Sequence, residues 1–335
     1  MSARTLRVAV VGLGDIAVRA HLPALVARHD VSVVAVCDAD PTRLEAGPAG
    51  ARRTTDAASV IADGDVDAVV IATPPHATAA LARAALEAGK YVLAEKPLGR
   101  STAEAWALQD APGVRERLQI GLTYRHHPAV DTLRELVRSG ALGSPLFIQA
   151  AICDEAADPV GDPVGHARRL SSLERLPPVV SDGVHACDRI NYLLGATPVQ
   201  VTGWSVRTDP TFACANVNGG ALTYADGTVA RLEVVWLTPV LPASQFVVTG
   251  ALGRAVLDPP TFALSVEFAD GRRQQHDAPG DKTTVCFALQ LERFVTHCFT
   301  GTPPVPGFDE ALASLELAER IAEAAGVAPP AEVPA

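Results

Sequence analysis

The sequence predicts two domains: an α/β domain built on a doubly wound parallel sheet, then an α+β domain with a large, mainly antiparallel open sheet. Over the first third of the chain, short apolar runs alternate with helical patterns, as in a parallel sheet covered by helices on both faces. After about Gly121, strand patterns follow that are joined by Asp-Gly hairpin turns. With 335 residues, the chain is long enough for two ordinary domains.

The first domain opens with a β-branched run and a glycine turn. We expect four strands, each too short for a helix and each beside turn residues: Leu6–Val11, Val31–Cys37, Ala68–Ala72 and Tyr91–Ala94. Between the third and the fourth, the Ala- and Leu-rich segment Ala77–Glu87 predicts a helix, which Gly89 ends.

The second domain changes pattern. We place the first domain at residues 1–122, the second at 123–326 and a frayed Ala/Pro-rich tail at 327–335. The expected elements are a helix over Ala129–Arg138, a hairpin of Ala221–Tyr224 with Thr228–Leu237, a hairpin of Phe262–Phe268 with Arg272–His276, and a C-terminal helix over about 309–325 with Asp309 as N-cap. The tandem tetrapeptides that start at Asp158 and Asp162 predict a loop, a candidate lid.

Composition excludes several classes of protein. Apolar residues make up 48% and charged residues 20% of the chain, which is typical of a globular protein. The net charge is −10 without a long basic run, so we expect no nucleic-acid partner. We expect no secretory signal and no membrane span, because the apolar runs are too short. The six scattered cysteines contain no CxxC pair, which favours free thiols in the cytoplasm.

A GxGxxA motif follows the first strand, in the segment Val8-Ala-Val-Val-Gly12-Leu-Gly14-Asp-Ile-Ala17. Gly12 permits a tight turn, Gly14 lets a pyrophosphate approach the backbone, and Ala17 lets the helix pack close to the strand. Asp38 ends the second strand, where an acidic residue binds the ribose hydroxyls of NAD and repels the 2′-phosphate of NADP. We therefore expect NAD rather than NADP. The cofactor-binding residues expected here are Gly12, Leu13, Gly14, Asp15, Ile16 and Asp38.

Further segments accompany this motif along the chain. They are Ala72-Thr73-Pro74-Pro75-His76, Glu95-Lys96-Pro97, Gly121-Leu-Thr-Tyr-Arg125-His-His-Pro128-Ala and Asp182-Gly183-Val184-His185-Ala186-Cys187-Asp188. In this order, with the GxGxxA motif, the sequence resembles the glucose-fructose oxidoreductase / inositol dehydrogenase / rhizopine catabolism family. The resemblance covers nearly the whole chain, and the family is broad in substrate.

This resemblance implies a Rossmann domain followed by an α+β domain whose open sheet forms oligomer contacts, here a homodimer or homotetramer. It implies a hydroxylated substrate between the domains, with Lys96 contacting cofactor and substrate hydroxyl and His185 acting as general acid/base. Both residue types suit that chemistry, since histidine titrates at about pH 6.5 and a lysine ammonium stabilises a developing alkoxide. The cofactor contacts implied in these segments are Thr73, Pro74, His76, Glu95 and Lys96.

The chain departs from the family pattern near His185. Many members carry Asp or Asn four residues before the histidine, where this chain has Ser181, with Asp182 one residue later. Asp182 is a candidate catalytic and substrate-binding residue, and whether Asp182 or Ser181 completes a proton relay stays open. Pro177-Pro178-Val179 replaces a Gly-rich run, and Thr78 replaces the second histidine after the Thr-Pro-Pro segment.

Other polar residues are weaker candidates. Tyr124, Arg125 and Arg168 are expected at the substrate, where an arginine could hold a carboxylate or phosphate, and His166 and Arg169 lie beside Arg168. Trp236 is expected to be a packing residue that could also line the pocket or an interface. We expect no metal site, because the acidic residues at 154, 155, 158 and 162 fit no ligand spacing and suggest a solvated loop.

The sequence therefore predicts an NAD-dependent dehydrogenase that transfers a hydride to or from a secondary hydroxyl of a sugar, cyclic polyol, amino sugar or nucleotide sugar. Two alternatives stay open. One is a redox-neutral lyase or glycosidase with tightly held NAD, and the other is a non-catalytic dinucleotide sensor. Fold resemblance alone supplies no substrate.

Overall fold

The computed structural model describes residues 5–278 and 280–327. Contacts divide the chain into two compact units. Unit 1 comprises the chain up to His126 together with Thr283–Leu312, and unit 2 comprises His127–Lys282 together with the chain from Ala313 onward. We had expected the boundary at residues 122/123 and the whole segment after it in the second domain. The structure differs from that expectation, because residues 283–312 belong to unit 1.

Unit 1 is built on a six-stranded sheet with the order β3-β2-β1-β4-β5-β6, in which every pairing is parallel. Because β1 pairs with both β2 and β4, the chain winds outward in both directions from the centre, and the carboxyl ends of β1 and β4 form the switch point where such sheets bind ligands. The strands are β1 (Leu6–Val11), β2 (Val31–Cys37), β3 (Arg52–Thr54), β4 (Ala68–Ile71), β5 (Tyr91–Ala94) and β6 (Leu118–Ile120). The doubly wound α/β prediction is confirmed.

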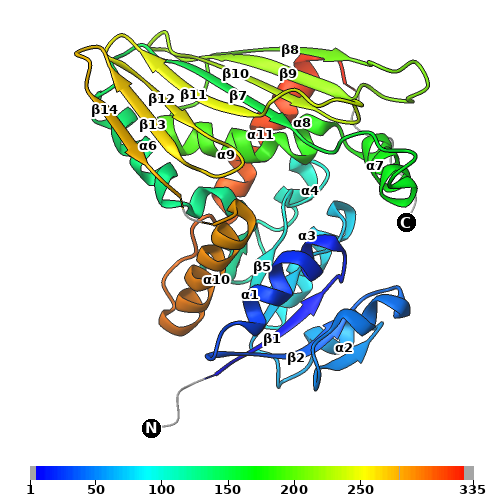
Figure 1. Cartoon of the computed structure of the whole chain (residues 1–335). Coiled ribbons are helices and arrows are strands. Elements are labelled where there is room, and N and C mark those ends of the chain that lie inside the picture. Colours follow the sequence, from blue (N-terminus) through cyan, green and yellow to red (C-terminus); the bar gives the residue numbers. More distant parts are fainter. Residues whose placement is uncertain (1–4, 279, 328–335) are drawn as a thin grey trace. The chain divides into compact units, whose positions relative to one another are not determined.

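The helices of unit 1 connect and cover these strands (Figure 1). They are η1 (Ala17–His21), α1 (Leu22–Val26), η2 (Pro41–Ala46), α2 (Ala57–Ile61), α3 (Pro75–Glu87), α4 (Thr102–Trp106), α5 (Val114–Arg117), η3 (Thr123–His126) and α10 (Lys282–Thr300). Helix α3, which connects β4 to β5, contains the helix expected at Ala77–Glu87.

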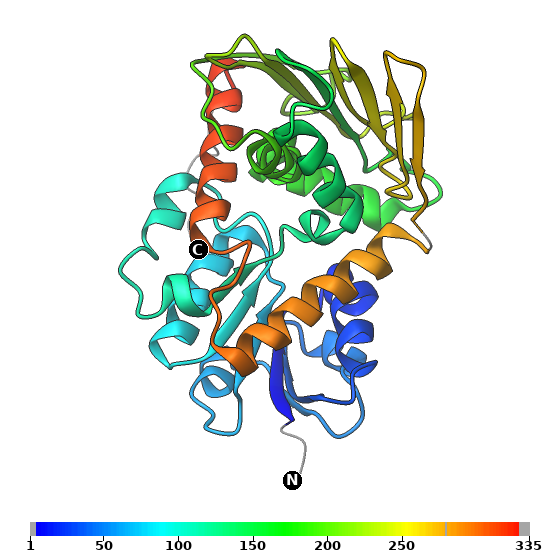
Figure 2. The same cartoon turned by 90° about the vertical axis from the view of Figure 1, so that its left-hand side faces the viewer.

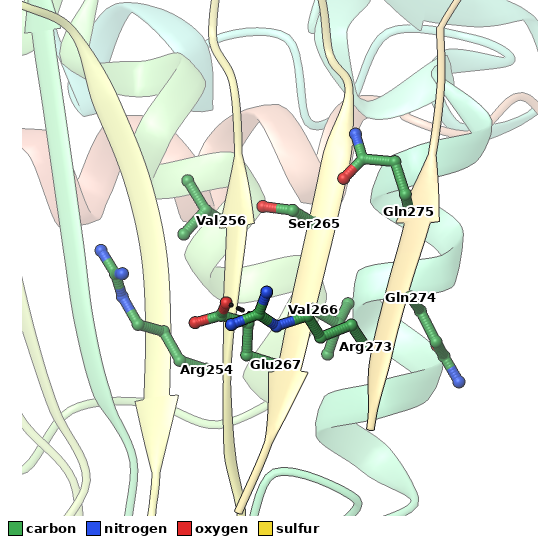
Figure 3. A pocket seen from close by; sticks show the side chains of 8 residues that line it. All are labelled: Arg254, Val256, Ser265, Val266, Glu267, Arg273, Gln274 and Gln275. Atoms are coloured by element: carbon green, nitrogen blue, oxygen red, sulfur yellow. Dashed lines mark ion pairs between the residues drawn. The ribbon is translucent and has the colours of Figure 1, made fainter. Parts of the chain in front are cut away.

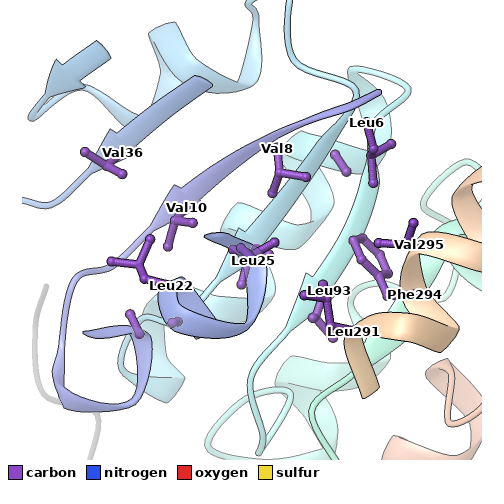
Figure 4. Packing of buried hydrophobic residues seen from close by; sticks show 14 of the residues in the cluster. Leu6, Val8, Val10, Leu22, Leu25, Val36, Leu93, Leu291, Phe294 and Val295 are labelled. Atoms are coloured by element: carbon purple, nitrogen blue, oxygen red, sulfur yellow. The ribbon is translucent and has the colours of Figure 1, made fainter. Parts of the chain in front are cut away.

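A hydrophobic core explains why α10 belongs to unit 1. Figure 4 shows alternate side chains of β1, among them Val8 and Val10, facing side chains from α1, β5 and α10. From α10, the side chains of Leu291, Phe294 and Val295 enter this cluster, and each is at most 4% exposed. The sequence pattern of the N-terminal segment does not indicate that a helix so much later in the chain packs against it.

Unit 2 is built on an eight-stranded sheet with the order β14-β13-β12-β11-β7-β10-β9-β8. All neighbours pair antiparallel except β7 and β10, which pair parallel, so the prediction of a large, mainly antiparallel sheet is confirmed. The strands are β7 (Phe147–Cys153), β8 (Gln200–Val206), β9 (Val217–Thr223), β10 (Val229–Val235), β11 (Gln245–Gly250), β12 (Gly253–Leu257), β13 (Leu264–Phe268) and β14 (Arg273–His276).

Helices cover one face of this sheet, as both views show (Figures 1 and 2). Among them, α9 is largely buried and packs against β7, β10 and α6. The helices of this unit are α6 (Pro128–Arg138), α7 (Pro163–Arg175), α8 (Pro178–Ser181), α9 (Gly183–Leu194) and α11 (Phe308–Ala324), the last of which begins in unit 1.

Two local expectations for the second domain were wrong. The second tetrapeptide is not a loop, because Asp162 caps α7 by accepting the N–H of Gly165 and Pro163 occupies the first helical position. This is a normal helix start, in which proline needs no N–H donor. In α11, Asp309 lies in the first turn rather than at the N-cap. Most of the tail expected to be frayed, from residue 328 onward, lies outside the described residues.

Candidate active site

The glycine turn after β1 lies at the switch point of the unit 1 sheet. Gly12 has a φ of +92°, and a Cβ there would lie 2.4 Å from the carbonyl oxygen of Ala72, at the end of β4. A Cβ on Gly14, in contrast, would meet no atom within 4 Å. Gly12 is thus required by the fold itself, whereas the space at Gly14 is open for a diphosphate to approach the backbone. This local structure fits a dinucleotide.

Asp38, directly after β2, is tied to the glycine turn. Its Oδ2 atom accepts the N–H of Leu13 at 2.7 Å and its Oδ1 atom accepts the N–H of Asp40 at 2.9 Å. The residue is 8% exposed, and each oxygen has a second lone pair. The guanidinium of Arg43, about half exposed, lies 3.9 Å from Oδ2. A carboxylate held in this way can accept hydrogen bonds from ribose hydroxyls.

The first helix after the turn continues from Asp15 through a π-helical segment into α1. Asp15 and Ile16 are exposed, Ile16 to 38%, whereas Ala17 is fully buried against the core. Cys37, beside Asp38, is buried as well. Burial and the neighbouring carboxylate raise the pKa of its thiol, which therefore stays neutral.

The loop between β4 and α3 is fixed by Thr78. Its Oγ1 atom lies 3.2 Å from Thr73 Oγ1 and donates to the carbonyl oxygens of Thr73 and Pro74. Thr78 is 1% exposed, while His76 on the same turn is exposed. At this departure from the family pattern, the chain uses a buried hydroxyl to shape the loop.

Glu95 and Lys96 follow β5 at the same edge of the sheet. The Glu95 carboxylate is 7% exposed and contacts His21, whose Nε2 atom lies 2.8 Å from Oε1. Its other oxygen accepts the backbone N–H of Lys96 at 3.2 Å, and Lys96 itself is half-buried. His21 is not among the site residues expected from the sequence. Its spacing of four residues from the helix-packing Ala17 is the signal that places it on the buried face of a helix.

In unit 2, Asp182 and His185 lie where α8 meets α9. Asp182 links the two helices, and the N–H of His185 donates to its carbonyl oxygen at 3.0 Å. The Oδ2 atom of Asp182 accepts the indole N–H of Trp236 at 3.0 Å. Trp236 is 4% exposed, and its backbone carbonyl accepts the amide N–H of Asn216 at 2.6 Å. Trp236 and Asn216 are therefore unexpected supports of the segment that carries His185.

The remaining candidates divide between the units. In unit 1, Arg125 is 5% exposed with a guanidinium nitrogen 4.0 Å from Glu310, and Tyr124 is half-buried. In unit 2, Arg168 is exposed on α7. Its neighbour Arg169 pairs with Glu155 and Asp162, so this acidic segment is partly neutralised rather than simply solvated.

Within unit 1, the structure brings the glycine turn, Asp38, the Thr73-Pro74 loop and the Glu95-Lys96 pair to the carboxyl edge of one sheet. Within unit 2, it brings Asp182 and His185 together at the start of α9. The thiol of Cys187, two residues after His185, has a raised pKa because it is fully buried, so it stays neutral.

One further feature lies outside these residues. A groove of about 450 Å³ lies on the strands β12–β14 of unit 2, and its lining is mixed, with the charged Arg254, Glu267 and Arg273 beside the apolar Val256 and Val266 (Figure 3). Among the described residues, no group of three or more His, Cys, Asp or Glu side chains could hold a metal ion. None of the described helices is both long enough and apolar enough to cross a membrane.

Comparison with known proteins agrees with this geometry. Residues 6–118 match the family model of an oxidoreductase family with an NAD-binding Rossmann fold, and residues 130–256 match the C-terminal domain model of the same family. An oxidoreductase from Agrobacterium radiobacter, solved in complex with NAD+, L-tartaric acid and magnesium, has the same fold, with a TM-score of 0.80 over 96% of each chain at 22% identity.

Two curated relatives span nearly the same length. Inositol 2-dehydrogenase of Rhizobium meliloti is 28% identical over 327 residues, covering 94% of this chain and 95% of the relative. dTDP-3,4-didehydro-2,6-dideoxy-alpha-D-glucose 3-reductase of Streptomyces violaceoruber is 30% identical over 303 residues, covering 86% and 85%. The chain therefore belongs to the glucose-fructose oxidoreductase / inositol dehydrogenase / rhizopine catabolism family of NAD(P)-dependent sugar, polyol and nucleotide-sugar oxidoreductases.

Proposed function

We propose that this protein is an NAD-dependent dehydrogenase or reductase that interconverts a secondary hydroxyl and a ketone on a sugar, cyclic polyol, amino sugar or nucleotide sugar. The observation that carries the proposal is the anchored Glu95-Lys96 pair at the same sheet edge as the glycine turn and Asp38. The relatives named as an inositol dehydrogenase and a nucleotide-sugar 3-reductase support this range of substrates.

The cofactor site that we propose lies along the carboxyl edge of the unit 1 sheet. The turn from Gly12 to Ile16 would receive the diphosphate, and Asp38 the hydroxyls of the adenosine ribose. Asp38 favours NAD, because a 2′-phosphate beside its buried carboxylate would add a repulsive charge. On the nicotinamide side we propose the loop that contains Thr73, Pro74 and His76, and then Glu95 and Lys96.

The bound nicotinamide supplies an acceptor or donor of hydride. The residues of this chain would supply the proton chemistry. Lys96 would hold the reacting hydroxyl and stabilise negative charge on its oxygen as the C–H bond breaks. His185 would take the hydroxyl proton in oxidation and return it in reduction. The substrate would also contact Tyr124, Arg125 and Arg168, with an arginine suited to a carboxylate or phosphate group.

Either Asp182 or Ser181 could complete a proton relay with His185, and the contact between Asp182 and Trp236 bears on this choice. Its carboxylate accepts the indole N–H, and its carbonyl accepts the N–H of His185. We propose that Asp182 positions His185, as part of the substrate site, instead of passing protons itself. Ser181, four residues before His185, is the relay candidate that this assignment leaves.

The proposal is tested with purified protein, NAD+ and a panel of inositols, free sugars, glycosides and nucleotide sugars. We expect reduced nicotinamide to accumulate with one substrate class. A product that forms only when NAD+ is present, without net accumulation of reduced nicotinamide, would instead indicate the redox-neutral alternative. NAD+ binding without any product would indicate the sensor.

We also propose that the protein forms a homodimer or homotetramer through the open face of the unit 2 sheet, as predicted from the family resemblance. This face carries half-exposed apolar side chains, with Phe147 42% and Val206 49% exposed. Light scattering on the wild-type chain and on Phe147→Arg tests the proposal, because an arginine in the contact should lower the measured mass. A cytoplasmic location stays a prediction from the sequence.

A further inference from the structure

His21 and Glu95 form a buried pair inside unit 1. The two residues are 3% and 7% exposed, and Nε2 of His21 lies 2.8 Å from Oε1 of Glu95. The other carboxylate oxygen accepts the backbone N–H of Lys96 at 3.2 Å. One carboxylate therefore joins the helix that starts at the glycine turn to the backbone of Lys96.

Pro23 explains why the helical turn that ends at His21 is wider than an α-helical turn. In η1, the N–H of Leu22 bonds to the carbonyl oxygen of Ala17, five residues earlier. Pro23 has no N–H to offer the carbonyl of Arg19, and its ring crowds that carbonyl, so a regular α-turn is disfavoured here. A single π-turn inside a helix is often found at functional sites.

The surroundings of the Glu95 carboxylate leave it little freedom. A Cβ on Gly121 would lie 3.0–3.1 Å from three atoms of this side chain, so any larger residue there would push the carboxylate from its place by a few tenths of an ångström. The ring of Phe287 meets the imidazole edge-on, with 4.9 Å between the ring centroids. A buried carboxylate that loses a donor is strongly destabilised and shifts toward other donors or water.

We propose that His21 is a positioning residue for Lys96, acting through Glu95. The inference rests on the function proposed for Lys96 and extends it to a residue outside the reacting groups. Successive side chains of an extended segment point to opposite sides, so anchoring Glu95 toward His21 directs Lys96 the other way. The same pair couples Lys96 to the helix that follows Gly14, so that a change at the glycine turn reaches the Lys96 backbone.

The scarcity of lysine makes a direct test possible. The whole chain has three lysines: Lys90, Lys96 and Lys282. Labelling with nitrogen-15 lysine therefore gives three backbone amide signals in an NMR spectrum of the full chain. The Lys96 signal is identified by its loss in Lys96→Arg, and the other two signals serve as internal controls.

Two His21 variants and a matched control decide the question. His21→Leu removes the donor, and His21→Gln keeps a donor of similar reach. His29→Leu changes an exposed histidine after α1. We expect His21→Leu to move or broaden the Lys96 signal while Lys90 and Lys282 stay in place. His21→Gln and His29→Leu should leave all three signals near their wild-type positions.

A substrate found in the panel adds a kinetic readout. We expect kcat to fall about 10- to 100-fold in His21→Leu, because small misplacements of a catalytic group are costly, and to recover in His21→Gln. The Kd for NAD+, measured by calorimetry, should change much less. If His21→Leu does not fold, His21→Asn, whose shorter side chain cannot span the contact, is expected to give the same selective shift.

An unchanged Lys96 signal in the donor-less variant would overturn the proposal, as would equal displacement of all three signals, which indicates a general structural role. NAD+ added to the wild-type chain separates this result from the function proposed above. If NAD+ leaves the Lys96 signal unmoved while the His21→Leu shift is present, the proposed nicotinamide site fails and the coupling through Glu95 stands.

Discussion

The two glycines of the GxGxxA motif should fail in different ways when each is replaced by alanine. At Gly12, the new Cβ would lie 2.4 Å from the Ala72 carbonyl oxygen, at a φ of +92°. The left-handed backbone costs about 1–2 kcal/mol for a non-glycine residue. Relieving the overlap with backbone atoms adds about 1–3 kcal/mol. Gly12→Ala should therefore destabilise the apo protein by about 2–5 kcal/mol.

Gly14→Ala is the matched control, because its Cβ would meet no atom within 4 Å and its backbone needs no positive φ. The apo protein should unfold at nearly the wild-type temperature. A diphosphate that needs this space would be displaced, so the Kd for NAD+ should rise about tenfold or more, which corresponds to about 1.4 kcal/mol.

Differential scanning fluorimetry without cofactor and calorimetric titration with NAD+ separate the two effects. Gly12→Ala should lower the apo melting temperature by several degrees, and Gly14→Ala should leave it within about one degree. The reasoning is refuted if Gly14→Ala binds NAD+ as tightly as wild type, or if Gly12→Ala melts at the wild-type temperature.

Three more outcomes are expected. Asp38→Ala removes the acceptor of the Leu13 N–H and of ribose hydroxyls. Calorimetry should therefore show much weaker NAD+ binding and a smaller preference for NAD+ over NADP+. An unchanged ratio of the two Kd values would contradict the role of Asp38. Trp236→Phe deletes the donor to Asp182 and should cost about 1–3 kcal/mol in denaturant unfolding, with less effect in an Asp182→Ala background. Burial lowers the pKa of His126 from 6.5 to about 3, so the folded state resists a proton that the unfolded state accepts below pH 6.5. Between pH 7 and pH 5, the wild type should lose about 2 kcal/mol more stability than His126→Leu, and parallel curves for the two proteins would exclude this cause.

Much of the fold could be predicted because its signals are local. Four strands of the first domain were expected, and their bounds agree with those of β1, β2, β4 and β5 to within one residue. Each is a short β-branched run beside a turn. The two Asp-Gly hairpins were found for the same reason. The α7 start was missed because Asp-Pro was interpreted as a loop signal, although it also caps a helix when an amphipathic segment follows.

The candidate site could be predicted where one segment carries its own chemistry. The glycine turn, Asp38 and the Glu95-Lys96 pair each lie within one short segment at the end of a strand, so each can be recognised locally. His21 and Trp236 were not predicted as site supports, because each acts through a residue far along the chain: His21 through Glu95, and Trp236 through Asp182. The return of α10 to unit 1 is likewise a long-range packing event with no local signature.

The most direct test of the central proposal measures turnover and NAD+ binding in the same three proteins: wild type, Lys96→Met and His185→Ala. The proposal predicts that the wild type reduces NAD+ with one class of sugar, polyol or nucleotide sugar, and that both variants lose about 100-fold or more in kcat while still binding NAD+. Undiminished turnover in either variant would contradict the proposed roles of Lys96 and His185.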